Sequence, residues 1–163
     1  MILIALGSNI SGLWGSPRSA IRKAIRYLDS QGCRLIRASS LYETSPLGKT
    51  DQPNFINAVA RIETGMTPET LLERLQQIES LAGRVAGEKW GPRALDLDII
   101  DYNGVIRKRP PPVLPHAGIP QRPFVLAPIA EIAPRWRHPI LDKTAAQLLK
   151  ELRGQSEGAI LRR

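Results

Sequence analysis

Hydrophobic residues recur along this chain at two spacings, and each spacing predicts one kind of secondary structure. Alternation with polar residues predicts strands from Phe55 to Ile62 and from Leu95 to Tyr102. The short apolar segment Met1–Leu6 predicts a buried strand, and the residues from Arg34 to Tyr42 indicate a fourth. Between Phe55 and Ile62, the residues assigned to the core face are Ile56, Ala58, Ala60 and Ile62.

Apolar residues spaced three and four apart predict helices in four places. The first is expected to begin at Pro17 and to end at Gly32. The clearest begins at Thr67, an N-cap that is followed by a first-turn proline and an acidic residue. Two shorter helices are expected from Phe124 to Ile132 and from Thr144 to Leu152.

The first six elements follow the order strand, helix, strand, strand, helix, strand. This order is typical of an α+β fold, the ferredoxin-like sandwich, in which helices pack on an antiparallel sheet. Because no repeat or low-complexity segment interrupts its 163 residues, we expect residues 1–163 to form a single domain.

The composition narrows the classes of partner. A formal net charge of +8 favours either a nucleic-acid binder or an enzyme that handles anionic substrates. The basic residues are scattered, and the short clusters Arg107–Arg109 and Arg162–Arg163 are interpreted as solvated surface. Cys33 is the only cysteine, which excludes an intramolecular disulfide and favours a reducing compartment. No apolar run is long enough to span a bilayer, so we expect a cytoplasmic protein without a membrane partner.

The predicted strand from Leu95 carries two carboxylates on one face. Strand alternation sends Asp96 and Asp98 to one side and Leu95, Leu97 and Ile99 to the other. Aspartate is depleted in strands and neighbouring like charges repel, and a bound cation would remove this cost. Mg²⁺ prefers such hard oxygen ligands. Taken alone, the pair favours a plain exposed acidic strand over a metal site.

A cationic loop precedes this strand and changes the interpretation of the acid pair. Arginine and lysine donors opposite a carboxylate-bound metal would stabilise phosphate oxygens. No Gly-x-x-x-x-Gly-Lys-Ser/Thr loop and no kinase-type glycine loop occurs, so an ATP site here must have another design. The segment Trp90–Asp101 is therefore predicted to form a metal-assisted nucleotide site. The residues singled out in this loop are the basic Arg84, Lys89 and Arg93, together with Trp90.

The segment WGPRALDLDI, residues 90–99, closely resembles the signature of the 6-hydroxymethyl-7,8-dihydropterin pyrophosphokinase family of folate biosynthesis. The resemblance covers most of the chain and adds little beyond Pro139. Its other parts are residues 5–9 (ALGSN), 45–48 (SPLG), 51–57 (DQPNFIN), 114–116 (LPH) and 122–126 (RPFVL).

The resemblance implies a reaction and a set of nucleotide-binding residues. The terminal diphosphate of ATP would pass to the pterin hydroxymethyl group, and AMP would be released. Asp96 and Asp98 would hold two Mg²⁺ ions that bridge the phosphates, and Arg84 and Arg93 would be catalytic. Phosphate contacts are implied for Arg84, Arg93, His116 and Arg122, and nucleotide-side contacts for Glu79, Lys89, Trp90 and Ile99.

The resemblance also implies how the pterin is bound. The ring would lie between Phe55 and Phe124, because a flat heteroaromatic ring gains dispersion contacts from two parallel faces. The Asn57 amide offers donors and an acceptor that match the mixed edge of the pterin. Thr44, Pro46 and Leu47 would shape the surrounding loop, and ATP and the pterin are the expected small-molecule partners.

Some assignments stay open. From its own context, His116 could equally be a structural turn residue between prolines, and no residue can be named as a general base. Ala86 and Ala117 depart from the family pattern, in which an arginine and a larger residue are frequent. A ferredoxin-like RNA-binding module is the main alternative, but it requires aromatic residues on central strands, where this chain is expected to place its acid pair. We therefore expect no nucleic-acid partner.

Overall fold

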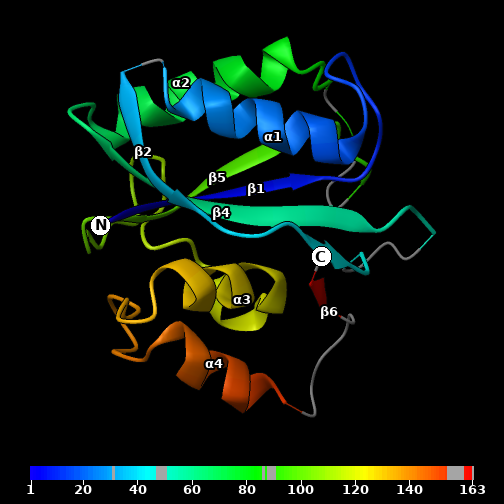
Figure 1. The fold of residues 1–163 in the computed structure, drawn as a ribbon. Helices are drawn as coiled ribbons and strands as arrows, with labels where there is room; N and C mark the ends of the chain where they lie inside the picture. Colours follow the sequence, from blue (N-terminus) through cyan, green and yellow to red (C-terminus); the bar gives the residue numbers. More distant parts are fainter. Residues whose placement is uncertain (31, 47–50, 86, 88–90, 154–159, 163) are drawn as a thin grey trace.

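The protein is built on a sheet of six antiparallel strands with helices on both faces (Figure 1). The structure is a computed structural model that describes all residues except 31, 47–50, 86, 88–90, 154–159 and 163. The elements are β1 (Ile2–Ser8), α1 (Pro17–Leu28), β2 (Cys33–Ala38), β3 (Tyr42–Thr44), β4 (Phe55–Thr64), α2 (Pro68–Leu81), β5 (Asp96–Tyr102), η1 (Ile119–Gln121), α3 (Pro123–Ile132), α4 (Ala145–Leu152) and β6 (Ile160–Arg162).

The order of the strands confirms the predicted ferredoxin-like fold. The main path through the sheet is β5-β1-β4-β3-β6, and β2 pairs with β4. The neighbours β5-β1-β4-β2 are the four strands of the predicted strand-helix-strand-strand-helix-strand unit. Helices α1 and α2 cover one face of this sheet, whereas α3 and α4 lie on the other (Figure 1).

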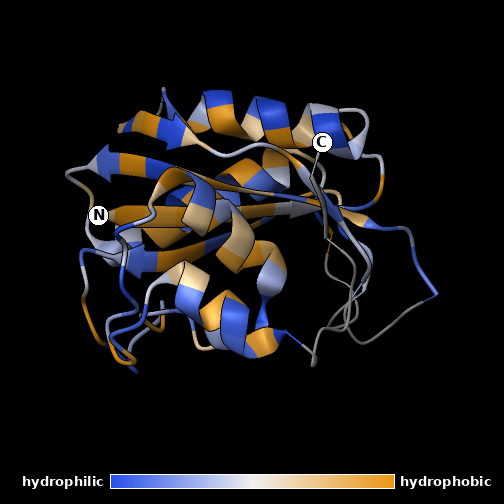
Figure 2. Cartoon of the chain, turned by 60° about the horizontal axis from the view of Figure 1, so that its bottom comes forward, coloured by the Kyte–Doolittle hydropathy of each residue, from blue (hydrophilic) through white to orange (hydrophobic). Residues whose placement is uncertain are grey.

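The core lies on both sides of the sheet, because β4 sends apolar side chains in both directions. The residues predicted to face the core, such as Ile56 and Ile62, pack with α1 and α2, as expected. Val59, on the opposite face, is also buried, and it packs with Leu3 and Ile129 beneath α3. Figure 2 shows the resulting pattern, in which hydrophobic strands are enclosed by helices with alternating hydrophobic and hydrophilic turns.

Local capping explains where the predicted helices begin and end. Thr67 caps α2 and Thr144 caps α4, each by accepting a hydrogen bond from the backbone N–H three residues later. The prediction that the first helix ends at Gly32 was wrong, because α1 ends at Leu28 with Asp29 as its C-cap. The Asp29 carboxylate then accepts the backbone N–H of Leu35 at 2.7 Å, and this bond directs the chain into β2.

The strand predicted from Arg34 to Tyr42 is divided into β2 and β3. Ser40 lies between them, and its N–H and hydroxyl both donate to Glu131 of α3, at 2.9 and 2.8 Å. The Tyr42 hydroxyl donates to the other oxygen of the same carboxylate at 2.6 Å. A residue about 90 positions away thus interrupts the strand. Strand β6, which pairs with β3, was also absent from the prediction.

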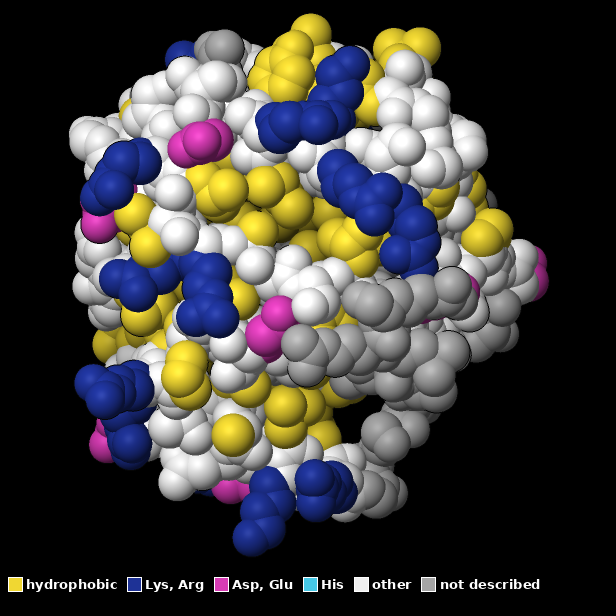
Figure 3. Space-filling view, in the orientation of Figure 1, with side chains coloured by type: hydrophobic (Ala, Val, Ile, Leu, Met, Phe, Trp, Pro, Cys, Tyr) yellow, Lys and Arg dark blue, Asp and Glu magenta, His cyan; other side chains and the backbone are white. Residues whose placement is uncertain are grey.

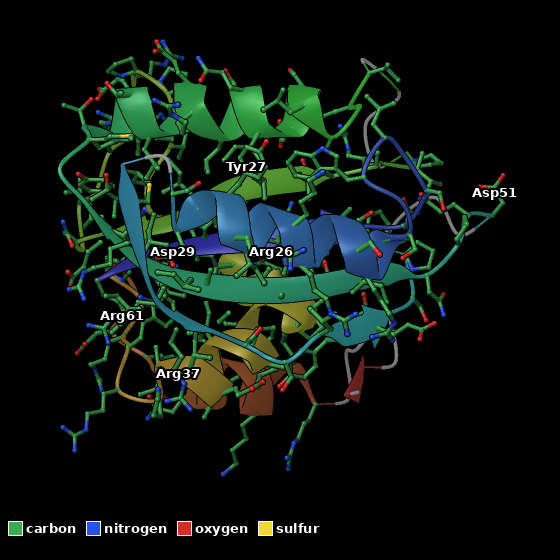
Figure 4. All side chains as sticks on the ribbon, turned by 45° about the horizontal axis from the view of Figure 1, so that its top comes forward. Arg26, Tyr27, Asp29, Arg37, Asp51 and Arg61 are labelled. Carbon is green, nitrogen blue, oxygen red and sulfur yellow. The ribbon has the colours of Figure 1, made fainter. Side chains whose placement is uncertain are left out.

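Basic side chains are distributed over the surface rather than gathered in one patch, as the sequence indicated. Figure 3 shows separate groups of Lys and Arg on one face. In Figure 4, Arg37 and Arg61, which are partners in the β2–β4 register, lie at the opposite end of the sheet from Asp51. One interpretation was wrong: Arg107 is not simply solvated, because its side chain is 19% exposed and lies 2.5 Å from Glu69.

Candidate active site

The acid pair lies on β5 with the predicted alternation. Leu97 and Ile99 are buried in the core, whereas Asp96 and Asp98 line a pocket on the other face of the sheet. Strand β5 stands at the end of the described sheet order, so the expectation that the acid pair occupies a central strand was wrong. The edge position leaves room beside the carboxylates for side chains from other segments.

Arg84 and Glu79 stand beside Asp96. The Nη1 atom of Arg84 lies 2.5 Å from Oε1 of Glu79 and 2.9 Å from Oδ1 of Asp96. The same Glu79 oxygen accepts the backbone N–H of Leu97 at 2.7 Å. Burial, and then the charge of Asp98, raise the pKa of Asp96. Arg84 thus partly compensates Asp96, whose ionisation is opposed by burial and by repulsion from the Asp98 charge.

Glu79 gives the site a testable pH dependence. Burial raises the pKa of Glu79 from 4.5 to about 7, although Leu97 and Arg84 act in the opposite direction. A raised carboxyl pKa favours the protonated folded state, so this stabilisation is complete below pH 4.5 and is lost as the pH rises through about 7. The rise of the Glu79 pKa from 4.5 to about 7 corresponds to about 3 kcal/mol of unfolding free energy.

A Glu79→Gln variant is expected to lack this part of the pH dependence, because glutamine does not titrate. Denaturant unfolding of both proteins between pH 4.5 and 8 measures the difference, and titrating groups that do not interact with Glu79 contribute equally to the two proteins. Parallel loss of stability in the two proteins would show that Glu79 has no raised pKa.

Two basic side chains approach Asp98 from the segment before α3. The Nε2 atom of His116 and the Nη1 atom of Arg122 lie 3.7 and 3.8 Å from Oδ2 of Asp98. Burial, and to a lesser extent the charge of Arg122, lower the pKa of His116, while Asp98 acts in the opposite direction. The Nδ1 atom accepts the backbone N–H of Gly118 at 3.1 Å, so the neutral ring carries its proton on Nε2, toward Asp98.

A pocket of about 210 Å³ extends from the carboxylates across the sheet to α3. One end of this pocket is charged, because Arg93 and Arg122 lie there beside the two aspartates. The other end is lined by two phenylalanine rings and an amide. The lining residues are Ala5, Leu6, Gly7, Thr44, Ser45, Phe55, Asn57, Ala58, Gly91, Arg93, Asp96, Asp98, Arg122, Phe124 and Val125.

Asn57 is fixed at the uncharged end by its neighbours. The residue is 7% exposed, and its Nδ2 atom donates to the Thr44 hydroxyl at 2.7 Å. A Cβ atom on Gly7 would lie 3.1 Å from the Asn57 carbonyl oxygen, so glycine leaves room for this amide. Phe55 and Phe124 are half-buried, which leaves part of each ring accessible from the pocket.

The structure thus brings together most of the residues that the sequence singled out, but not all in the expected way. The Ile99 side chain is buried in the core on the other side of the sheet, so it does not face the carboxylates. Pro46 is half-buried but does not line the pocket. Leu47, Lys89, Trp90 and the family departure Ala86 lie outside the described residues.

Two residues of the quoted segments have roles that the sequence did not indicate. Asp101, the end of the predicted nucleotide segment, is buried and accepts hydrogen bonds from Trp136 Nε1 at 2.7 Å and Gly104 N–H at 2.9 Å. Its role is therefore structural. Gly7 lines the pocket, and its position in the quoted ALGSN segment was the available signal.

The carboxylate pair fits a magnesium ion that is shared with a phosphate ligand. Among the described residues, no group of three or more His, Cys, Asp or Glu side chains could hold a metal ion. Mg²⁺ is commonly bound by one or two carboxylates and completed by water and substrate phosphates. The oxygen donors of Asp96 and Asp98 therefore suit a metal that arrives with a nucleotide rather than a closed protein cage.

The fold and the site define the class of this protein. An RNA-binding module of this fold would use an open sheet face, but here Leu3 and Val59 are fully buried beneath α3. A carboxylate pair beside arginines and an aromatic pocket is instead the site of a phosphate-transferring enzyme. The model of the 7,8-dihydro-6-hydroxymethylpterin-pyrophosphokinase (HPPK) family matches residues 3–134, and the chain belongs to this family.

Relatives from distant organisms agree with this assignment. The chain is 41% identical over 139 residues to the 2-amino-4-hydroxy-6-hydroxymethyldihydropteridine pyrophosphokinase of Pseudomonas aeruginosa, covering 85% of this chain and 83% of that protein. It is 42% identical over 130 residues to the enzyme of the same name from Bacillus subtilis, covering 79% and 75%. The folic acid synthesis protein fol1 of Schizosaccharomyces pombe is 37% identical over 153 residues, which are 93% of this chain and 20% of fol1.

Solved structures share the fold at low sequence identity. A crystal structure of HPPK-DHPS in complex with substrates superposes with a TM-score of 0.73 at 12% identity, over 94% of this chain and 43% of that one. Wild-type Plasmodium falciparum HPPK-DHPS gives a TM-score of 0.71 at 14% identity, over 94% and 41%. This chain therefore spans less than half of the HPPK-DHPS chains. Among its own described residues, no helix has the length and apolar character that crossing a bilayer requires.

Proposed function

We propose that this protein transfers the terminal diphosphate of ATP to the hydroxymethyl group of 6-hydroxymethyl-7,8-dihydropterin and releases AMP, as a step of tetrahydrofolate biosynthesis. One observation carries the proposal: a single pocket joins an aromatic and amide end to two carboxylates and two arginines. This is the arrangement that a pterin alcohol and a polyphosphate need when they react with each other.

In the proposed reaction, the hydroxymethyl oxygen attacks the β-phosphorus of ATP. The new bond joins this oxygen to the β-phosphorus, the bond from the β-phosphorus to the oxygen that bridges it to the α-phosphorus breaks, and AMP leaves with that oxygen. The proton of the hydroxyl group passes to water or a phosphate oxygen, because no described residue is placed as a general base. Catalysis then depends on positioning and charge neutralisation.

Asp96 and Asp98 would hold the metal, and we expect two Mg²⁺ ions together with ATP. When bound, Mg²⁺ neutralises phosphate oxygens and favours charge build-up on the transferred group. Arg93 and Arg122, at the same end of the pocket, would donate to the phosphate oxygens. Arg84 would also reach a phosphate once the metal takes over its role beside Asp96, and His116 would donate through Nε2.

The pterin would occupy the uncharged end of the pocket between Phe55 and Phe124. The Arg122 guanidinium lies 5.9 Å from the Phe124 ring, so this arginine stands where the two substrates meet. Asn57, held by Thr44, would read the amide-like edge of the ring. Relatives often carry an arginine at the position of Ala86 and a larger residue at the position of Ala117. At these two positions the phosphate and adenosine contacts of this chain are expected to differ from those of the family.

An Asn57→Ala variant is expected to weaken pterin binding about ten- to a hundredfold, because a buried pterin donor or acceptor loses its partner. Binding of a non-hydrolysable ATP analogue should stay within about twofold of the wild type. Calorimetric titration with each ligand checks both values. Asn54→Ala is the matched control, because Asn54 is exposed and lies three residues away. Equal pterin affinity in the Asn57 and Asn54 variants would exclude the proposed orientation.

Residues 1–163 are proposed to act as one pyrophosphokinase domain. A cytoplasmic location is also proposed, since the only cysteine, Cys33, is free and buried, as expected in a reducing compartment. The direct test of the function is an assay of purified protein with ATP, the pterin and Mg²⁺. Turnover should require all three and should stop on addition of EDTA. ATP consumption that is independent of the pterin would reject the proposal.

A further inference from the structure

Asn9, the first residue after β1, connects two segments that are distant in the sequence. It is 3% exposed, and its side-chain amide is used at both ends. The Nδ2 atom donates to the Gln52 side-chain oxygen at 2.8 Å and to the Pro53 carbonyl at 3.0 Å. The Oδ1 atom accepts the backbone N–H of Arg93 at 2.8 Å. The partners lie 43, 44 and 84 residues away along the chain.

Each partner segment leads into one half of the pocket. Gln52 and Pro53 precede β4, which carries Phe55 and Asn57 at the uncharged end. Arg93 precedes β5 and lines the charged end itself. Asn9 is therefore bonded to the residues that lead into the pterin end of the pocket, Gln52 and Pro53, and to Arg93, which lines the phosphate end.

The two sides of this connection, which we call the phosphate-side arm (the bonds to Arg93) and the pterin-side arm (the bonds to Gln52 and Pro53), differ in how many other bonds hold them. On the phosphate side, the backbone N–H of Asn9 also donates to the Arg93 carbonyl at 3.0 Å, and the Ser8 hydroxyl donates to the Ala94 carbonyl at 2.6 Å. On the pterin side, Asn9 reaches Gln52 and Pro53 through its Nδ2 atom. Loss of the Nδ2 donor would release the pterin-side arm while β1 still holds Arg93.

We propose that Asn9 is a positioning residue that couples the two substrate sites, so that a substrate that stabilises the bonded position of one segment favours binding of the other substrate. The inference rests on the proposed function, because it assigns the pterin and ATP to the two ends of the pocket. Two ligands that each stabilise the same bonded arrangement must increase each other's affinity by the same factor.

An Asn9→Asp variant separates the two arms. The carboxylate keeps an acceptor for the Arg93 N–H, but it cannot donate, so it places an oxygen against the Pro53 carbonyl, which can only accept. The matched control is Asn54→Asp, because Asn54 makes the same chemical change at an exposed position near the same segment.

The measurement is the pterin Kd with and without a saturating non-hydrolysable ATP analogue and Mg²⁺. In the wild type and the Asn54→Asp control, the analogue is expected to strengthen pterin binding by about tenfold. In Asn9→Asp, this factor should fall toward one, while the Kd of the analogue alone changes by less than about twofold. A merely structural role would lower the melting temperature and leave the factor unchanged.

Gln52→Leu provides a second route that leaves Asn9 intact. It removes one of the two Nδ2 acceptors, so the coupling factor should fall to an intermediate value, and this variant decides the matter if Asn9→Asp does not fold. A wild-type factor of one, or equal factors in the wild type and the folded variants, would overturn the coupling role. Failure of the wild type to bind the pterin at all would instead overturn the proposed function, and the inference would fall with it.

Discussion

An Asp98→Ala variant is expected to fold and to lose turnover by on the order of 10³-fold. The carboxylate lies in the pocket beside Asp96, where it would hold a metal bound to the phosphates of ATP. Loss of several kcal/mol of charge stabilisation in the transition state gives a factor of this size. Because the change also removes one of two repelling charges, the stability of the metal-free protein should not fall. Asp96→Ala should show the same loss of turnover.

Steady-state kinetics and thermal unfolding of the same samples test this expectation. Asp51→Ala is the control, because Asp51 is an exposed aspartate that makes no contact with the pocket in the described structure. Excess Mg²⁺ should not restore the variants, since the missing group is a ligand. Near-normal turnover in both Asp96→Ala and Asp98→Ala would show that the acid pair does not hold a catalytic metal.

Replacing Arg93 by alanine is expected to lower kcat by about 10²-fold, the usual cost of losing one donor to transition-state charge. The guanidinium lines the charged end of the pocket. The Arg93 backbone is bonded to Asn9 through both its N–H and its carbonyl, so the segment should keep its position without the side chain. Arg93→Lys should recover part of the loss, because lysine keeps the charge but not the forked donor geometry.

The split between kcat and KM distinguishes this role from simple binding. A raised KM for ATP with unchanged kcat would mean that Arg93 contacts ATP equally in the ground state and the transition state. Arg135→Ala, at an exposed position outside the pocket, should retain wild-type kinetics. A full kcat in Arg93→Ala would remove this residue from the catalytic set.

Features that depend on neighbouring residues could be predicted from the sequence. The alternation of Asp96 and Asp98 with Leu97 and Ile99 follows from strand geometry alone, and the structure confirms it. The start of α2 follows from Thr67 because a cap acts within a single turn. The family resemblance added residues that periodicity could not assign, such as Asn57 and Phe124, and both line the same pocket.

Features that depend on distant contacts could not be predicted. Glu131 divides a predicted strand by taking the hydrogen bonds of Ser40, and nothing near Ser40 in the sequence indicates this partner. The second helical layer buries Val59 on a strand face that had no assigned cover. Asn9 was visible in a quoted motif, but its role follows from bonds that join segments 43 and 84 residues away.

The identity of the nucleotide product tests the central claim most directly. ATP, 6-hydroxymethyl-7,8-dihydropterin and Mg²⁺ are incubated with the purified protein, and the products are separated by anion-exchange chromatography. Attack at the β-phosphorus predicts AMP and a pterin that carries two phosphates, in equal amounts. ADP together with a pterin that carries one phosphate would contradict the account, because the transferred group would then be the γ-phosphate alone.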